Sequence, residues 1–385
     1  MKIYLDNSTA TQIDPEVLDT MKEVYEKYDG VPRADIGHSL AMDAKEVLDK
    51  SRKTIADSIN VQFNEIIFTA SKEESFNLIV RGLHLKNKGK NHLITTKIED
   101  FSFLKMCKYL EKNKGMEIDY LDVDKEGKIN LDELKGKIKE NTFLVYVEHV
   151  NSEIGTIQDI EKIGEICKRK DVFFASDLTN SYMKIKTDAE KQNIDFAILN
   201  SAQIHGPKPI CAVYKKKSIQ ITPLIFGSSG EFGIVPGMVN VPHIAGFAKA
   251  VELMKKQEND KIRELRDYLK EELLKIKKTY INNPEDNVFN NLNVSFFGVE
   301  GEAMLLRMDN YGIFVKSGSS CFSEILESSH VLKAIEVPTE LAQSSIIFTL
   351  SRFVGREDIE KTVEAVKEVL ADLRKISCMW DEKDE

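Results

Sequence analysis

The sequence has no apolar run long enough to cross a bilayer and no secretory signal at its beginning, so we expect a cytoplasmic protein without a membrane segment. It also has no long basic stretch: the longest is Lys215-Lys216-Lys217, which a charged loop explains. The formal net charge is −9. This acidic balance argues against general binding to nucleic acid or to an anionic membrane surface.

Cysteine is scarce as well, with five residues at positions 107, 167, 211, 321 and 378. They form no Cys-x-x-Cys pair and no zinc-binding spacing, which indicates a reducing compartment rather than a disulfide framework. Cys107, Cys167 and Cys211 lie in apolar helical or strand-like segments, so we expect them in the core. The single tryptophan, Trp380, stands near the C-terminal end of the sequence.

The chain does have a regular alternation of short apolar runs and helical patterns. The apolar runs lie at 65–69, 92–96, 142–147, 172–176, 194–199 and 210–214, and helical patterns lie at 73–83, 101–113 and 160–170. Strands that read as continuous apolar runs between helices predict an α/β fold with a mainly parallel sheet covered on both faces. A long helix at 244–276 is then expected to lead to a smaller C-terminal unit with strands at 291–296 and 345–350.

Cys321 differs from the other cysteines because Gly and Ser surround it in Lys316-Ser-Gly-Ser-Ser-Cys-Phe-Ser323. Gly and Ser favour exposed turns, so this sulfur should be reachable. A lone cysteine is most often a small buried hydrophobe without chemistry. The alternative is a reactive thiol or a metal ligand. Other features of the sequence are needed to distinguish these roles.

Ordered segments from Tyr4 to about Trp380 match one family of proteins. They include Tyr4-Leu-Asp-Asn7, Asn151-Ser-Glu-Ile-Gly155, Ile204-His-Gly-Pro-Lys208, Asn291-Leu-Asn-Val-Ser-Phe296 and Ser317-Gly-Ser-Ser-Cys321. In this set the chain resembles the cysteine desulfurases of the NifS/IscS type, which are class-V aminotransferases of pyridoxal-phosphate (PLP) fold type I. The resemblance implies a large α/β domain at 16–254 around a mainly parallel seven-stranded sheet. It also implies a small α+β domain formed by 1–15 and 255–385.

The same comparison predicts that the covalent and phosphate-binding parts of the cofactor site are lost. Gln203 stands where the family has the lysine that forms an imine with PLP, and an amide nitrogen is not nucleophilic. Lys208 matches the family's separate second lysine. Glu73 stands in place of a threonine of the Gly-Ala-Thr phosphate cradle, where a carboxylate repels a phosphate. Met238 stands where a threonine is donated across the family's dimer.

The ring and substrate contacts are replaced too. Asp100 takes the place of the stacking histidine, Ser152 of an asparagine, and Asn180 of a glutamine. Only Asp177, which in the family pairs with the pyridine nitrogen, is unchanged. Ile347 replaces the arginine that holds the substrate carboxylate, which removes a bidentate clamp.

These replacements predict a desulfurase-like protein without PLP chemistry, a pseudoenzyme on which PLP is absent or bound without a covalent bond. The resemblance implies that Cys321 accepts sulfur as a persulfide. Cys321 could equally be a thiolate ligand of an iron–sulfur cluster shared with a partner. The segment around Trp380 resembles the part of the family that docks an IscU-type scaffold, although it could also simply anchor the last helix. The family resemblance further implies a homodimer.

Two alternatives stay open on the sequence. The first is an active PLP-dependent enzyme that releases sulfur from L-cysteine to a Cys321 persulfide and uses Lys208 or another lysine. The second is an inactive structural partner of an active paralogue. For two histidines, His38 and His330, we expect structural roles, and a metal at His330 is the less favoured reading.

Overall fold

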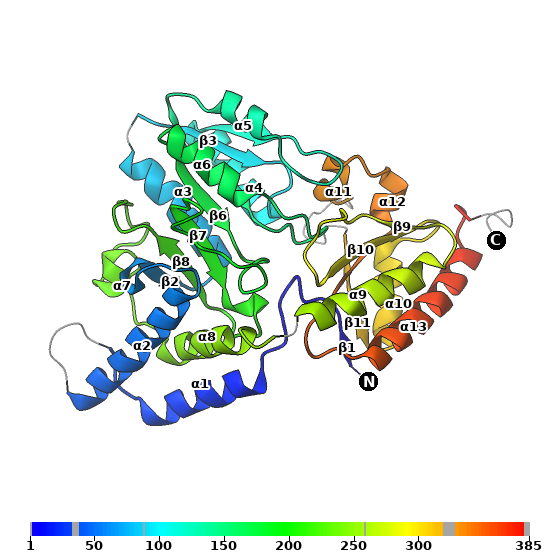
Figure 1. The fold of residues 1–385 in the computed structure, drawn as a ribbon, viewed down its shortest axis with the longest axis horizontal. Coiled ribbons are helices and arrows are strands. Elements are labelled where there is room, and N and C mark those ends of the chain that lie inside the picture. The colour runs from blue at the N-terminus through cyan, green and yellow to red at the C-terminus, as the bar shows by residue number, and fades with distance from the viewer. Residues whose placement is uncertain (1, 33–37, 88, 258, 319–327, 381–385) are drawn as a thin grey trace.

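The computed structural model describes the chain except for residues 1, 33–37, 88, 258, 319–327 and 381–385, and Cys321 therefore lies outside the described residues. Figure 1 shows the large α/β part on one side and a smaller α/β part on the other, with the N-terminal segment running between them. The large sheet has seven strands in the order β2-β8-β7-β6-β5-β3-β4. The predicted α/β class and the mainly parallel seven-stranded sheet are confirmed.

Six of the seven strands of this sheet run in the same direction, and β8 alone runs antiparallel to its neighbours β2 and β7. The strands are β2 (Ile66–Thr69), β3 (His92–Thr96), β4 (Glu117–Leu121), β5 (Thr142–Glu148), β6 (Phe173–Asp177), β7 (Phe196–Asn200) and β8 (Cys211–Lys215). Because parallel strands end at the same edge, the residues that follow β2, β3, β5, β6 and β7 meet there.

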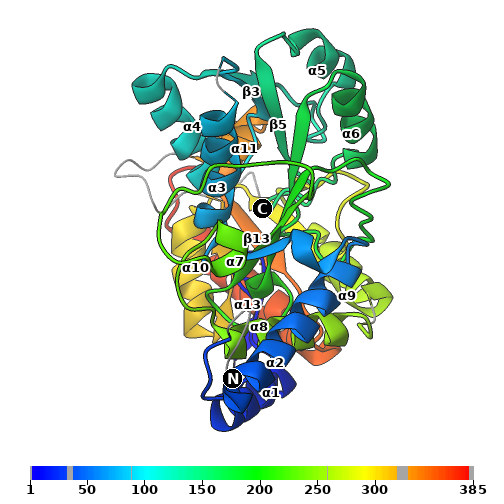
Figure 2. The ribbon, with the colours of Figure 1, turned by 90° about the vertical axis from the view of Figure 1, so that its left-hand side faces the viewer.

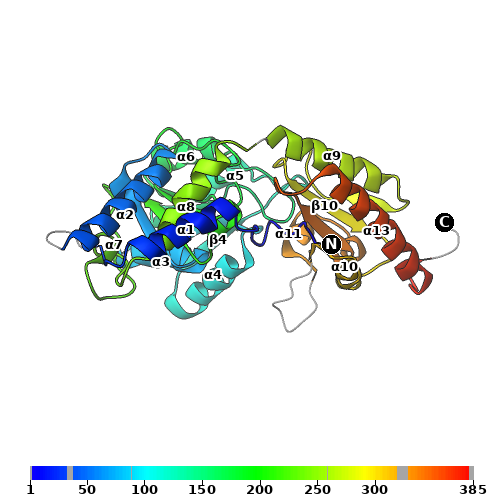
Figure 3. The same cartoon turned by 90° about the horizontal axis from the view of Figure 1, so that it is seen from below.

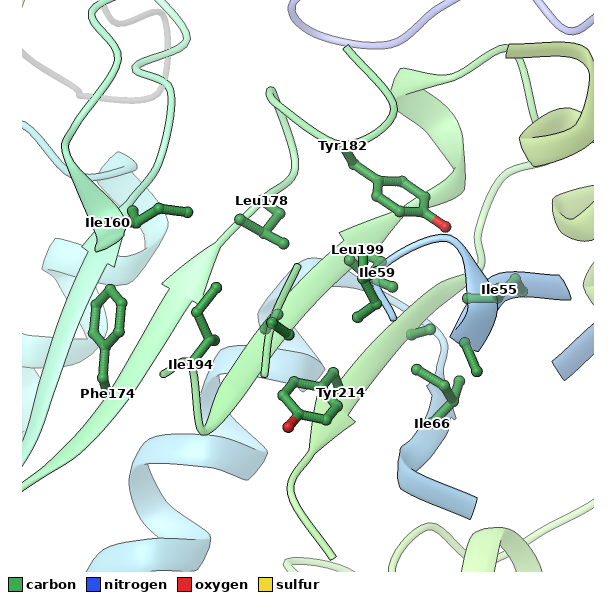
Figure 4. Close-up of a cluster of buried hydrophobic side chains, with 14 of the residues drawn as sticks. Ile55, Ile59, Ile66, Ile160, Phe174, Leu178, Tyr182, Ile194, Leu199 and Tyr214 are labelled. Atoms are coloured by element: carbon green, nitrogen blue, oxygen red, sulfur yellow. The ribbon is translucent and has the colours of Figure 1, made fainter. Parts of the chain in front are cut away.

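Helices cover both faces of the large sheet, which is why its strands are apolar on both sides. In β7, Ala197 and Leu199 pack with the helices α2 (Ser39–Asp57), α6 (Ile160–Arg169) and α8 (Val241–Met254). Phe196 and Ile198 pack on the other face with α3 (Lys72–Lys86) and α4 (Phe101–Lys114). Figure 2 shows α3 and α4 lying on the other side of the strands from α6. Figure 4 shows part of the buried hydrophobic cluster that contains Leu199.

The small part of the molecule is built on a four-stranded antiparallel sheet in the order β12-β13-β10-β9. Its strands are β9 (Thr279–Ile281), β10 (Asn291–Phe296), β12 (Lys316–Ser317) and β13 (Ser345–Thr349). The helices α9 (Asn259–Leu274), α10 (Gly301–Asn310) and α13 (Arg356–Lys375) share its core, as Figure 3 shows from below. The N-terminal strand β1 (Ile3–Tyr4) pairs with β11 (Ile313–Phe314), so the chain begins against this part.

One sequence-based expectation needs correction, and several short elements were not expected. The single helix expected at 244–276 is two helices, because α8 ends at Met254 and α9 begins at Asn259. The sequence between them has no apolar residue, and Lys256 N and Gln257 N donate to the carbonyl groups of Leu253 and Met254, which tightens and ends the helix. Strands β4 and β9 and the short helix α5 (Leu131–Lys137) were not expected from the pattern at all.

The buried cysteines are as predicted: Cys107, Cys167 and Cys211 are each at most 2% exposed. Burial raises the pKa of each of these thiols, so none of them is a thiolate at neutral pH. Within the described residues, no helix is long and apolar enough to cross a membrane.

One buried ion pair fastens α2 to the short helix α7 (Gly230–Gly233). Arg52 Nη2 lies 2.7 Å from Glu231 Oε1, and Arg52 Nη1 lies 2.7 Å from Glu231 Oε2. The Arg52 guanidinium also lies over the rings of Phe68 and Phe232, at 4.7 and 5.1 Å from their centroids. The two charged side chains are 4% and 5% exposed, so water could not solvate either charge if its partner were removed.

We predict that Arg52→Met destabilises the protein by about 3–5 kcal/mol, since it leaves the Glu231 carboxylate buried without a cation. Lys53→Met is the matched control on the same helix, because Lys53 pairs with Asp57 at the surface, where their side chains are 68% and 51% exposed. It should cost less than about 0.5 kcal/mol. Chemical denaturation of both variants measures the difference, and equal losses would contradict the assignment.

Candidate functional site

The candidate site lies at the carboxyl edge of the large sheet, where the ends of several strands meet. Asp177 is the last residue of β6 and Glu148 is the last residue of β5. Asp100 follows β3, Lys72 follows β2 as the first residue of α3, and Gln203 follows β7. The topology therefore places four of the positions predicted from the sequence at this edge, together with Lys72 and Glu148, which were not predicted to act. The four are Asp100, Asp177, Asn180 and Gln203.

Lys72 is the centre of a buried ion-pair cluster. Its Nζ lies 2.8 Å from Asp177 Oδ2 and 3.2 Å from Asp100 Oδ2. The Lys72 side chain is 11% exposed and that of Asp177 only 1%. The second oxygen of each carboxylate is held by the backbone: Asp177 Oδ1 accepts from Thr179 N and Asp100 Oδ1 from Ser102 N. Lys72 thus joins the N-terminus of α3 to β6 and to the N-cap of α4.

Two opposing effects determine which groups of this cluster are charged: burial favours the neutral forms, and the attraction between lysine and carboxylates favours the charged forms. Burial works to lower the pKa of Lys72, but Asp177, Asp100 and Glu148 outweigh it and raise that pKa well above its usual value. For Asp100 burial works to raise the pKa, but the Lys72 charge and the Ser102 N–H lower it to about 2. At neutral pH Lys72 is therefore a cation and Asp100 an anion.

Two further carboxyl groups border the cluster and are held neutral. Burial raises the pKa of Glu99 to about 8, and it raises the pKa of Glu148 well above the usual range although Lys72 opposes the shift. Glu99 accepts from Thr96 Oγ1 and from Glu148 N, while Glu148 Oε1 accepts from Asn180 Nδ2 at 2.9 Å. Asn180 is 6% exposed, and this hydrogen bond engages its side-chain nitrogen with Glu148.

Gln203 does not point its amide nitrogen to an open site. Its Nε2 donates to Thr9 O at 2.9 Å and to Ser8 O at 3.1 Å, and the residue is 4% exposed. Thr11 fastens the same N-terminal segment, because its N and Oγ1 both donate to Ala202 O. Gln203 is thus one of the groups that hold the N-terminal segment onto the large sheet.

The N-terminus of α3 is closed by its own side chains. Ser71 Oγ accepts from Glu74 N at 3.1 Å, and Glu74 Oε2 accepts from Ala70 N at 2.6 Å. Glu73 and Glu74 also put two carboxylates in the first turn. Ser71 therefore takes up one backbone N–H group at the start of the helix, and the two carboxylates lie at the positive end of the helix dipole that an anion would otherwise use.

The remaining predicted positions lie apart from this cluster or outside the described residues. Ser152 is partly exposed, and its carbonyl oxygen accepts from Asn291 Nδ2. Ile347 is fully buried in β13, Met238 is 83% exposed, and Lys208 is exposed. Cys321, predicted as a catalytic thiol or a metal ligand, lies outside the described residues.

The two histidines have structural partners. His38 caps α2, since its Nδ1 accepts from Ala41 N, and His330 Nε2 lies 2.9 Å from Glu99 O. No group of three His, Cys, Asp or Glu side chains able to hold a metal occurs in the described ranges.

Sequence reasoning missed the role of Lys72 and the presence of Glu148. Lys72 was considered only as a partial compensation for Glu73 at a phosphate cradle. The available signal was the appearance of a lysine at the start of a helix, where the macrodipole disfavours a cation. Such a lysine needs a nearby acid, and Asp100 and Asp177 were already known candidates.

A family model for aminotransferase class V matches residues 3–361. The cysteine desulfurase IscS of Dictyoglomus turgidum is 38% identical over 383 residues, which cover 98% of this chain and 96% of the relative. The cysteine desulfurase IscS of Methanosarcina thermophila is 37% identical over 380 residues, covering 97% of this chain and 93% of the relative. A solved NifS-like protein superimposes with a TM-score of 0.90 at 31% identity, covering 97% of this chain and 100% of that one. A NifS-like protein from Rickettsia africae superimposes with a TM-score of 0.86 at 28% identity, covering 96% of this chain and 100% of that one.

We predict that Glu99→Gln flattens the dependence of stability on pH. Burial raises the pKa of folded Glu99 from 4.5 to about 8, so the folded state keeps a proton that the unfolded chain releases. This contribution is full below pH 4.5 and is lost as the pH rises to about 8, at about 1.4 kcal/mol per pH unit. A glutamine keeps an acceptor for Glu148 N and a donor toward Thr96, without the titration.

Chemical denaturation between pH 5 and pH 8 measures this change of slope. The control is Glu126→Gln, which alters an exposed carboxylate in a turn and should leave the slope as it is. If Glu99→Gln has the same slope as the unchanged protein, Glu99 is not the buried acid described above.

Proposed function

The chain belongs to the cysteine desulfurase family within the class-V aminotransferases, and on that premise we propose that it carries sulfur without releasing it from L-cysteine. In this proposal it is a pseudoenzyme of sulfur trafficking and iron–sulfur cluster assembly. Cys321 accepts sulfur, or supplies a thiolate to a cluster shared with a partner.

The observation that carries the proposal is Gln203. The family requires a lysine amine at this position to bind PLP covalently, and Gln203 offers an amide whose nitrogen is not nucleophilic. The nitrogen of that amide is also occupied, because Nε2 donates to Ser8 O and Thr9 O, while Oε1 is buried without a partner among the described residues. A buried amide with two backbone acceptors serves to hold the N-terminal segment.

The other residues do not fit PLP either. A phosphate favours a helix N-terminus free of acidic side chains. The first turn of α3 instead carries the Glu73 and Glu74 carboxylates, and Ser71 Oγ takes up Glu74 N. A pyridine ring needs the Asp177 carboxylate, and that carboxylate is paired with Lys72. In this proposal, no chemical step of this chain uses PLP.

Sulfur transfer to Cys321 needs only a donor persulfide. The Cys321 thiolate attacks the outer sulfur of the donor, the donor's S–S bond breaks, and the donor leaves as a thiolate while a Cys321 persulfide forms. The sequence supports this role because Gly and Ser flank Cys321.

The proposal includes two protein partners and a cytoplasmic location. A second copy of this chain is supported by the exposed apolar side chains of Phe226 and Met238, which are 81% and 83% exposed. An IscU-type scaffold docking near the C-terminus is supported by Ile376, which is 77% exposed. Trp380 itself packs against Gly298 and over the Arg374 guanidinium, so it anchors the chain end beside that surface.

The names of the relatives favour a second function, an active PLP-dependent cysteine desulfurase. That function needs an unprotonated lysine elsewhere in the chain, because position 203 is a glutamine. Lys72 is unsuitable because its raised pKa keeps it protonated. Lys184 is the better amine, since burial lowers its pKa to about 8. It lines a cavity together with Gln257, Asn259 and Arg263.

We predict that the purified protein is colourless and stays so after incubation with PLP and gel filtration, and that it releases no sulfide from L-cysteine with a reductant. The reason is the absence of an imine-forming amine at position 203. A coenzyme absorbance band that borohydride abolishes, together with sulfide release, would establish the active enzyme instead. Loss of that band in Lys184→Met, but not in Lys208→Met, would then identify the amine.

We predict that Cys321→Ser abolishes sulfur uptake from a persulfide donor, because it removes the accepting thiol. Cys378→Ser is the matched control, since Cys378 is the exposed cysteine among those the structure describes. It should leave uptake unchanged. Mass spectrometry of the intact protein measures the added sulfur.

Undiminished uptake in Cys321→Ser would contradict the role of Cys321. Undiminished cluster assembly in the same variant would favour a purely structural partner of an active paralogue. Co-purification of the chain with such a paralogue from its native source tests that reading.

A further inference from the structure

A lysine ammonium lies where the family would hold the nitrogen of the cofactor ring. The resemblance assigns the partner of the pyridine nitrogen to Asp177, and in this structure Asp177 Oδ2 is 2.8 Å from Lys72 Nζ. In the part of the chain that the structure describes, Lys72 is the only ion-pair partner of Asp177. Asp100, which stands where the family has the ring-stacking histidine, is the second partner of the same ammonium at 3.2 Å.

The cluster is built rather than incidental, because each acid is fixed by its own element. Asp177 Oδ1 accepts from Thr179 N, and Asp100 Oδ1 accepts from Ser102 N as the N-cap of α4. Each carboxylate therefore has one oxygen bound to the backbone and the other turned to Lys72. Lys72 is itself fixed as the first residue of α3, whose N-cap is Ser71.

We propose that the Lys72 ammonium is an intrinsic cation that substitutes for a bound cofactor, neutralising Asp177 and Asp100 and joining α3, β6 and α4 around the site. This inference deepens the proposed function, on which it rests, by naming the group that occupies the place of the ring. It also names a ligand class: once the Lys72 side chain is removed, the site binds a small alkylammonium ion.

The physical reason is the cost of a buried carboxylate without a cation. Asp177 is 1% exposed, so water does not replace a lost partner. Glu99 and Glu148 lie close enough to influence the ionisation of this cluster, and both are acidic side chains that cannot supply a replacement cation. Removal of the Lys72 ammonium therefore leaves Asp177 beside three further acidic groups, those of Asp100, Glu148 and Glu99.

The test is a melting experiment on Lys72→Ala with propylammonium chloride as the probe. The truncation removes the outer three methylenes and the ammonium of Lys72, which together correspond to one propylammonium ion. We expect the melting temperature to fall by at least about 5 °C. Propylammonium should restore part of this loss in a saturable manner, and sodium chloride at the same ionic strength should not.

Two controls separate this result from a general effect of lysine removal. Lys97 pairs with Asp122 at the surface, where their side chains are 50% and 70% exposed. Lys97→Ala should therefore change the melting temperature by less than about 1 °C and show no response to the probe. The unchanged protein should also show none, because its own lysine holds the site.

A second pair of variants keeps the inference testable if Lys72→Ala does not fold. Lys72→Met and the double variant Lys72→Met/Asp177→Asn differ only in the charge left behind. The double variant should melt at least about 3 °C above the single one, because no uncompensated Asp177 carboxylate remains. A double variant that is no more stable than the single one would overturn the proposal.

Two further results would overturn it as well: a Lys72→Ala protein as stable as the parent, or a response to propylammonium no larger than the response to sodium chloride. None of these measurements involves PLP or sulfur. Uptake of PLP by the unchanged protein would therefore defeat the proposed function, while the melting series still decides the role of Lys72 separately.

Discussion

The structure of this site depends on one requirement, which is that the buried carboxylate of Asp177 must face a cation. Asp177 ends a central strand of the sheet and is 1% exposed. Lys72 supplies the charge from the first position of α3, although the helix dipole disfavours a cation there. The attraction of two acids, Asp177 and Asp100, outweighs that cost and fixes the start of α3 against the strand ends.

The surrounding residues are consistent with a site closed from within. Ser71 Oγ accepts from Glu74 N at the start of α3, Glu73 and Glu74 add carboxylates there, and Gln203 Nε2 donates to the backbone of Ser8 and Thr9. Glu99 is kept neutral by burial, so it adds no charge at neutral pH. The body of a class-V aminotransferase is thus retained, while its carboxyl edge is held together by the side chains of the chain itself.

The fold could be predicted from the sequence because both faces of the large sheet are covered, which makes strands such as β5 and β7 continuously apolar. β4 escaped this reasoning since Glu117 is exposed and the strand reads as partly polar. The break between α8 and α9 escaped it because periodicity cannot locate a turn in a run of polar residues. At the site, the replacement at Gln203 was visible in the sequence, but the contact between Lys72 and Asp177 joins distant segments and needed the fold.

The most direct test of the central claim is a crystal structure of the protein grown with excess PLP. We expect Lys72 Nζ within hydrogen-bond distance of Asp177 Oδ2 and no density for the coenzyme between them. Density for a pyridine ring whose nitrogen faces Asp177, with the Lys72 side chain displaced, would contradict it.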